Sequence, residues 1–103
     1  MFIRFLILFI FSLPSISLTI IDVRTQAEWD SGHLQGAIHI EWQDILQLSS
    51  EISKDEDIYL YCRSGNRSGK ATKILADAGY INALNAGSIK QASELLNKEI
   101  IKN

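Results

Sequence analysis

Short apolar runs recur along the chain after residue 17. They contain little polar alternation, which is typical of strands buried on both faces of a parallel sheet. The runs cover residues 18–23, 37–40, 58–61 and 81–84. This pattern predicts four short strands.

Residues with helical spacing separate these runs. The clearest apolar stripe joins Ala71, Ile74, Leu75 and Ala78, which fall at i, i+3, i+4 and i+7. We expect this helix to open at Ser68 and to end at Gly79, a residue type favoured just after a helix. The strand at 58–61 and this helix therefore flank a loop that begins at Cys62.

Two further helices are expected before this central unit. The first is short, and Thr25 and Glu28 have the spacing of a capping box at its start. The second begins at Trp42 and carries an apolar stripe at helical spacing. That stripe consists of Ile45, Leu48 and Ile52.

The last helix is expected after a turn at residues 85–87. Ser88 and Gln91 form a second capping box, and the apolar stripe that follows ends at Ile100. Four strands alternating with four helices predict an α/β fold, in which a parallel sheet of about four strands has helices on both faces.

The first 17 residues differ from the rest of the chain. Met1–Ser17 has Arg4 as its only charge, a continuous apolar run at Phe5–Phe11, and Pro14 before small residues. This is the pattern of a signal peptide cleaved before Leu18, so we expect export, to a bacterial periplasm, and one mature domain at residues 18–103. The alternatives are an uncleaved anchor and a core strand of the domain.

Cys62 is the only cysteine, and it stands at the carboxyl end of a predicted strand. Ligands of open α/β sheets bind at such ends, next to free amides of a helix N-terminus. Arg63 and Arg67 add positive charge, and Gly65 and Asn66 tolerate the positive φ of an anion-binding loop. The helix N-terminus and the two arginines both favour a reactive thiolate, so we expect the pKa of Cys62 to be lowered. The alternative is a small buried apolar residue.

The loop and a second block together resemble the rhodanese family. The loop "CRSGNR" matches the six-residue, cysteine-initiated loop of that family, and "IDVRTQAEWDSGHLQGAIHI" at residues 21–40 resembles its Asp-x-Arg and Gly-His-x-x-Gly-Ala segments. The segment "NAGSIKQASELL" extends the resemblance toward the C-terminus. Cysteine-dependent phosphatases instead carry arginine six positions after the cysteine, where this chain has Ser68.

The resemblance implies a thiosulfate sulfurtransferase with a persulfide on Cys62. The expected substrate-binding residues are Arg63, Ser64, Gly65, Asn66, Arg67 and Ser68. Asp22 and Arg24 are expected to form a structural pair near the site. His33 is expected to be a structural hydrogen-bonding residue, with a general base as the alternative.

The expected partners are a small sulfur donor and a cyanide or thiol acceptor. Two histidines and one cysteine do not make a zinc signature, and neither a metal nor an organic cofactor is implied. The formal net charge of −2 and the lack of basic runs argue against nucleic acid. Membrane contact is expected only through an uncleaved N-terminal segment. Two other functions stay open, a non-catalytic persulfide carrier and, less favoured, a cysteine-dependent phosphatase or arsenate reductase.

Overall fold

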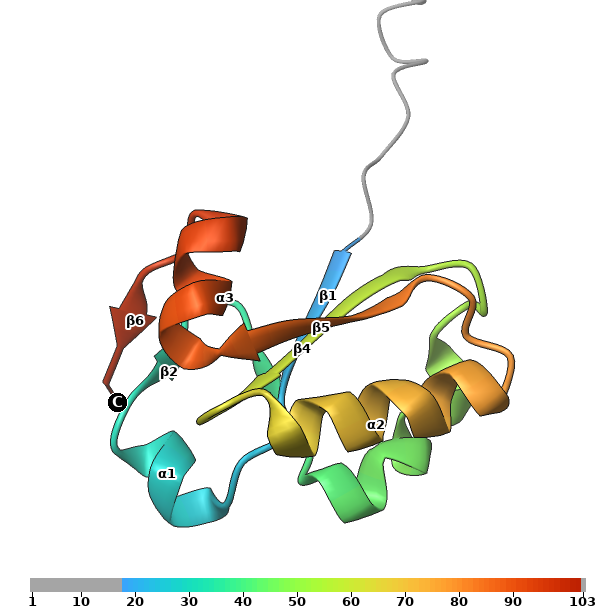
Figure 1. Ribbon diagram of the computed structural model, residues 1–103, viewed down its shortest axis with the longest axis horizontal. Helices are drawn as coiled ribbons and strands as arrows, with labels where there is room; N and C mark the ends of the chain where they lie inside the picture. Colours follow the sequence, from blue (N-terminus) through green and yellow to red (C-terminus); the bar gives the residue numbers. More distant parts are fainter. Residues whose placement is uncertain (1–17, 103) are drawn as a thin grey trace, which may run out of the picture.

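The chain forms a sheet whose strands are connected by helices (Figure 1). The computed structural model describes residues 18–102, apart from the side chains of residues 49–51. The expected signal peptide, Met1–Ser17, lies outside the described residues. The elements are β1 (Leu18–Asp22), α1 (Gln26–Asp30), β2 (His33–Leu34), β3 (Ile38–His39), the 3-10 helix η2 (Trp42–Glu51), β4 (Asp57–Cys62), α2 (Asn66–Asp77), β5 (Ala83–Ser88), α3 (Ile89–Leu96) and β6 (Ile100–Ile101).

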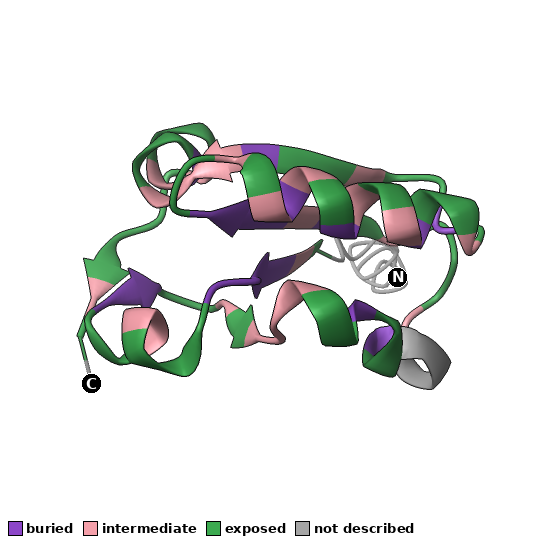
Figure 2. Cartoon of the chain, turned by 60° about the horizontal axis from the view of Figure 1, so that its bottom comes forward, coloured by how far each residue is buried: buried purple, intermediate pink, exposed green. Residues whose placement is uncertain are grey.

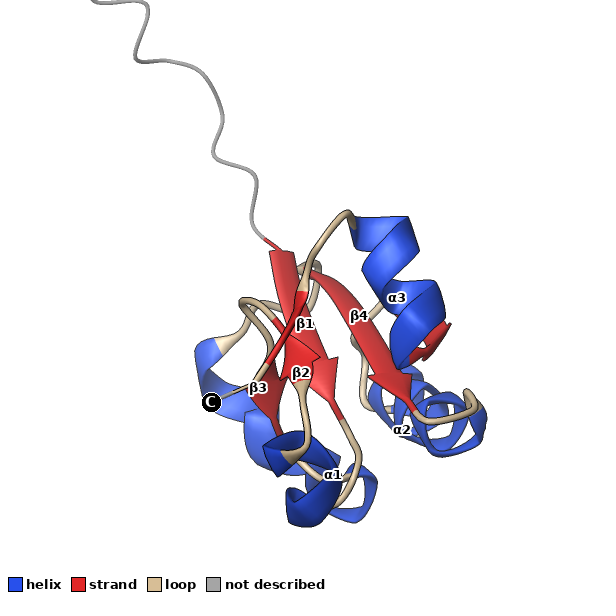
Figure 3. Ribbon diagram, turned by 90° about the vertical axis from the view of Figure 1, so that its left-hand side faces the viewer, coloured by secondary structure: helices blue, strands red, loops and turns tan. Residues whose placement is uncertain are grey.

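Four strands make the main sheet in the order β3-β1-β4-β5, and every neighbouring pair is parallel. The predicted parallel α/β fold is therefore confirmed. β4 is an inner strand, so the loop after Cys62 opens near the middle of the sheet's carboxyl edge. In Figure 3 the strands run between the helices that cover them.

Two apolar cores form on opposite faces of this sheet because side chains alternate along each strand. On β4, Ile58, Leu60 and Cys62 join the core beneath η2 and α2, which also contains Leu75. Tyr61 points to the other core, together with residues of α3. Buried residues accordingly line the strands in Figure 2, whereas the outward faces of the helices are exposed. This alternation directs the Cys62 side chain toward the face that α2 covers.

Helices α2 and η2 differ from the expectation, α2 in its first residue and η2 in its type. Helix α2 begins at Asn66 rather than at Ser68, with Gly65 at its N-cap in the left-handed region. The predicted helix from Trp42 is a 3-10 helix, interrupted at Asp44 by a φ of −104°. The 3-10 helix still buries Ile45 and Leu48 of the predicted apolar stripe.

The prediction for the C-terminal segment was wrong in two places. Residues 85–87 belong to β5 and do not form a turn, since a shift of register beside Leu60 accommodates one extra residue in the strand. The last helix ends at Leu96, because Asn97 adopts a left-handed φ of 54°. Ile100 then pairs with Leu34 in a small antiparallel sheet of β2 and β6.

The helices of this fold are short. Across residues 18–102, none of them combines the length and the apolar character needed to cross a bilayer.

Candidate active site around Cys62

Cys62 ends β4, and its sulfur lies inside the turn that leads into α2. The side chain is fully buried. The Gly65 N–H donates to Sγ at 3.0 Å, and the backbone N and hydroxyl of Ser68 lie 3.4 Å from the same sulfur. The loop therefore directs two backbone N–H groups and brings one hydroxyl to the same sulfur atom.

These donors decide the ionisation of the thiol. Burial alone raises the pKa of Cys62, but hydrogen bonds from Ser68, Ser64 and Gly65 outweigh it, so the pKa lies below the ordinary value of 9.0. The sequence led us to expect this direction from the helix N-terminus and the two arginines. In the structure the hydrogen bonds of the loop are the main cause.

Gly65 allows the loop to curl. Its φ is +95°, a conformation that side-chain-bearing residues rarely adopt. A Cβ at this position would also lie 3.4 Å from Cα of Gly87 on β5. Glycine therefore lets the loop approach the neighbouring strand closely.

Arg67 reaches from α2 to α1. Its Nη1 and Nη2 donate to the two carboxylate oxygens of Glu28 at 2.7 and 3.0 Å. The same carboxylate accepts the Thr25 N–H at 2.9 Å within the capping box of α1. Hydrogen bonds from Arg67 lower the pKa of Glu28 to about 2, and Glu28 in turn raises the pKa of Arg67.

The remaining predicted loop residues lie on its outer side. Arg63, Ser64 and Asn66 are all exposed. Among the side chains that the structure describes, Arg63 has no ion-pair partner. It therefore presents a free cation beside the loop, whereas the charge of Arg67 is already balanced by Glu28.

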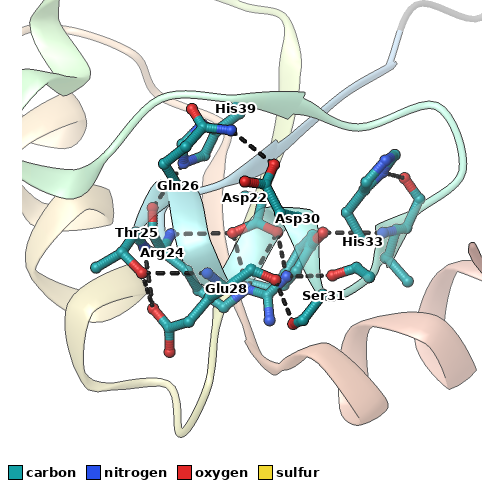
Figure 4. A network of polar contacts seen from close by, with 12 residues as sticks. Asp22, Arg24, Thr25, Gln26, Glu28, Asp30, Ser31, His33 and His39 are labelled. Carbon is teal, nitrogen blue, oxygen red and sulfur yellow. Dashed lines mark hydrogen bonds and ion pairs between the residues drawn. The ribbon is translucent and has the colours of Figure 1, made fainter. Parts of the chain in front are cut away.

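Asp22 and Arg24 form a buried ion pair at the end of β1, where Asp22 pairs with Tyr61 of β4 (Figure 4). The guanidinium donates to both carboxylate oxygens, with Nη2–Oδ2 at 2.7 Å and Nε–Oδ1 at 2.9 Å. Nη2 also donates to the Gly32 carbonyl at 2.6 Å. The pair thus ties the end of β1 to the turn that precedes β2.

His33 lies in β2 and is buried. Its Nδ1 is 3.0 Å from the Leu34 carbonyl oxygen, and its ring stacks on Trp29 with a centroid distance of 3.6 Å. The stacking packs α1 against β2, whereas the contact with Leu34 lies within β2. The structural role of His33 near the site stays a prediction.

The Leu34 N–H is satisfied by the hydroxyl of Tyr61, the residue before the cysteine, at 3.0 Å. Burial raises the pKa of Tyr61 strongly, so the hydroxyl stays protonated. The Tyr61 side chain thus connects β4 to β2 on the face opposite Cys62.

Two residues near the loop were not predicted as part of the site. Glu28 was predicted only as a helix cap, and Asn85 was assigned to a turn. Asn85 lies beside Ser68, with Oδ1 2.7 Å from its hydroxyl oxygen. Neither contact has a local sequence signal, because each joins segments distant in the chain.

Comparison with known protein families tests the resemblance that the sequence suggested. A sequence model described as the Rhodanese-like domain matches residues 12–95 of the chain. The chain belongs to this family. The resemblance seen in the two sequence blocks is thereby confirmed.

Curated relatives within the rhodanese family include sulfurtransferases. The chain is 34% identical over 84 residues to the thiosulfate sulfurtransferase PspE of Escherichia coli, covering 79% of this chain and 81% of PspE. It is 41% identical over 66 residues to a sulfurtransferase of Allochromatium vinosum, and these residues cover 64% of this chain and 62% of that protein.

Solved structures show the same fold. A rhodanese with anions from E. coli superposes with a TM-score of 0.74 at 29% identity, covering 84% of this chain and 100% of that one. These relatives place the chain among rhodanese-type sulfurtransferases.

Proposed function

We propose that the protein is a thiosulfate sulfurtransferase that carries a sulfane sulfur on Cys62. The observation that supports this most directly is the convergence of the Gly65 and Ser68 N–H groups on the sulfur. Such donors stabilise a thiolate, which is the nucleophilic form. They would equally hold the negative charge of a persulfide.

The proposed reaction has two displacement steps. The Cys62 thiolate attacks the outer sulfur of thiosulfate, the sulfur–sulfur bond of thiosulfate breaks, and sulfite leaves with the bonding electron pair. Cyanide or a thiolate then attacks the outer sulfur of the persulfide and releases the Cys62 thiolate. No electron acceptor is needed, because each step exchanges one nucleophile for another.

The exposed cation of Arg63 suits the sulfonate end of thiosulfate, since it has no carboxylate partner among the described side chains. Arg67 uses two N–H groups on Glu28, and its guanidinium has five in all. The proposal therefore assigns the first contact with the anion to Arg63 and leaves Arg67 a supporting role. From the loop sequence alone Arg67 is the favoured arginine, and its ion pair with Glu28 reverses that order.

Steady-state turnover of thiosulfate with cyanide tests the proposal. The wild-type protein should release thiocyanate over many cycles, and the Cys62→Ser variant should release none. A single stoichiometric release without turnover would indicate a persulfide carrier instead. Hydrolysis of an aryl phosphate faster than sulfur transfer would indicate a phosphatase and would contradict the proposal.

We propose further that the chain is exported, to a bacterial periplasm, after cleavage before Leu18. The support is the composition of Met1–Ser17, with its apolar run and its lone charge. Sequencing the N-terminus of protein recovered from the periplasm tests this. A first residue near Leu18 is expected, and an intact Met1 in the membrane fraction would contradict cleavage.

A further inference from the structure

Asn85 is held in one orientation beside the cysteine loop. Its Nδ2 donates to the Gly65 carbonyl at 3.0 Å, and its Oδ1 accepts the Gly87 N–H at 2.9 Å. A carbonyl only accepts and a backbone N–H only donates, so the amide cannot be reversed without losing both bonds. Oδ1 therefore faces Ser68.

The local backbone is shaped to bring this amide to the loop. The register shift in β5 adds Ala86 as an extra residue between Asn85 and Gly87, and such bulges redirect side chains next to functional sites. On α2, a Cβ at Gly69 would lie only 3.2 Å from Nδ2 of Asn85. The lack of a side chain at Gly69 leaves room for the amide.

Ser68 has one hydroxyl proton and two acceptors for it. The hydroxyl oxygen is 2.7 Å from Oδ1 of Asn85 and 3.4 Å from Sγ of Cys62. The shorter contact takes the proton, which leaves a lone pair of the oxygen toward the sulfur. A thiol can donate its S–H to that lone pair, but a thiolate needs the hydroxyl to turn toward it.

We propose that Asn85 is a positioning residue for Cys62, which acts through Ser68 by competing with the sulfur for the hydroxyl proton. When Cys62 is a thiol, the chain of donors runs from sulfur to Ser68 to Asn85. When it is a thiolate or an anionic persulfide, the hydroxyl turns to the sulfur and Oδ1 keeps the Gly87 N–H. The inference deepens the proposed function, since it concerns the nucleophile of that reaction.

Other charged groups near the sulfur belong to different contacts. Arg67 on α2 interacts with the Cys62 thiolate through its charge and is bound to Glu28 of α1. Arg63 is exposed in the loop. The side-chain bonds of Asn85 go instead to Ser68, Gly65 and Gly87. A change at Asn85 therefore leaves the contacts of these charged groups in place.

The test is the rate at which iodoacetamide alkylates Cys62, measured across pH in the full chain. Asn85→Asp keeps an acceptor for Ser68 but makes it a carboxylate, which binds the hydroxyl proton more strongly. The thiolate then loses one hydrogen bond, and at neutral pH alkylation should slow about tenfold, the effect of losing a bond to a charged group. The pH profile should move upward.

A second variant changes the sign of the effect. Asn85→Ala removes the competing acceptor, so the Ser68 hydroxyl is free to donate to sulfur. Alkylation at neutral pH should then be at least as fast as in the wild type. A slowing by Asn85→Ala equal to that by Asn85→Asp would overturn the proposal, because it would mean that the amide matters only for loop structure.

The route through Ser68 is tested by a double variant. In a Ser68→Ala background, Asn85→Asp should slow alkylation by clearly less than it does in the wild type, because only the added charge and the lost bond to the Gly65 carbonyl remain. An equal slowing in the wild-type and Ser68→Ala backgrounds would refute the coupling of Asn85 to Cys62 through Ser68. An unchanged pH profile of alkylation in Asn85→Asp would refute it as well. Near-ultraviolet circular dichroism verifies that each variant is folded. The readout needs no thiosulfate, so it separates failure of this proposal from failure of the proposed function.

Discussion

Replacing Glu28 by Gln tests whether the α1–α2 ion pair stabilises the cysteine loop. The variant keeps an oxygen for the Thr25 N–H, so the cap of α1 is retained, but the bidentate contact with Arg67 is lost. Glu28→Gln therefore isolates the contribution of one ion pair.

The magnitude follows from the ionisation of Glu28. Its pKa falls from the ordinary 4.5 to about 2, which at about 1.4 kcal/mol for each pH unit corresponds to an upper limit of about 3 kcal/mol. The side chains of Arg67 and Glu28 are 27% and 25% exposed. Solvent screening at such a site reduces the expected loss of unfolding free energy to about 1–2 kcal/mol.

Urea unfolding of both proteins across pH measures this loss. Because the folded pKa lies below the unfolded one, the stabilisation is present above pH 4.5 and is lost as the pH falls toward 2. The wild type should therefore exceed Glu28→Gln at neutral pH, and the difference should shrink over that acidic interval. A difference that is absent at neutral pH, or that stays constant down to the acid limit, would refute the reasoning.

Three further substitutions give outcomes fixed by single contacts. Gly65→Ala should lower the free energy of unfolding by about 1–3 kcal/mol, the cost of a side chain at a φ of +95°, and the thermal midpoint and sulfur transfer should fall with it. An unchanged melting curve would argue against that strain. Tyr61→Phe should cost about 1–3 kcal/mol in urea unfolding, because the buried Leu34 N–H loses its acceptor; equal stability would show that another group replaces it. Ser68→Ala should slow alkylation of Cys62 at neutral pH while the protein stays folded, since a donor to the sulfur is lost, and an unaltered rate would contradict the role of that hydroxyl.

The parts of the fold that the sequence predicted are those with a local signal. The buried run at residues 58–61 and the stripe from Ala71 to Ala78 correspond to β4 and α2. Their adjacency in the chain is enough to place Cys62 at the end of a strand. Periodicity and one glycine were sufficient for this part because the contacts involved are close in the chain.

The parts that were missed depend on pairing between distant segments. β5 contains Asn85 and Gly87, residue types typical of turns, and only its pairing with β4 makes it a strand. Ile100 continues the apolar spacing of α3, but the left-handed Asn97 ends that helix and lets Ile100 pair with Leu34. A periodic pattern cannot distinguish these outcomes.

The same reason explains what was found and missed at the site. Cys62 and its loop form a continuous segment, so their chemistry was visible in the sequence. Glu28 reaches Arg67 across 39 positions, and Asn85 reaches Ser68 across 17. Both contacts change the electrostatics of the loop, and only the folded chain brings their partners together.

The central claim is that Cys62 carries the transferred sulfur, and intact-protein mass spectrometry tests it most directly. After thiosulfate treatment, the wild type should gain the mass of one sulfur atom and lose it again on addition of cyanide. Cys62→Ser should gain nothing, although its melting curve matches that of the wild type. An unchanged wild-type mass, or the same gain in Cys62→Ser, would contradict the account.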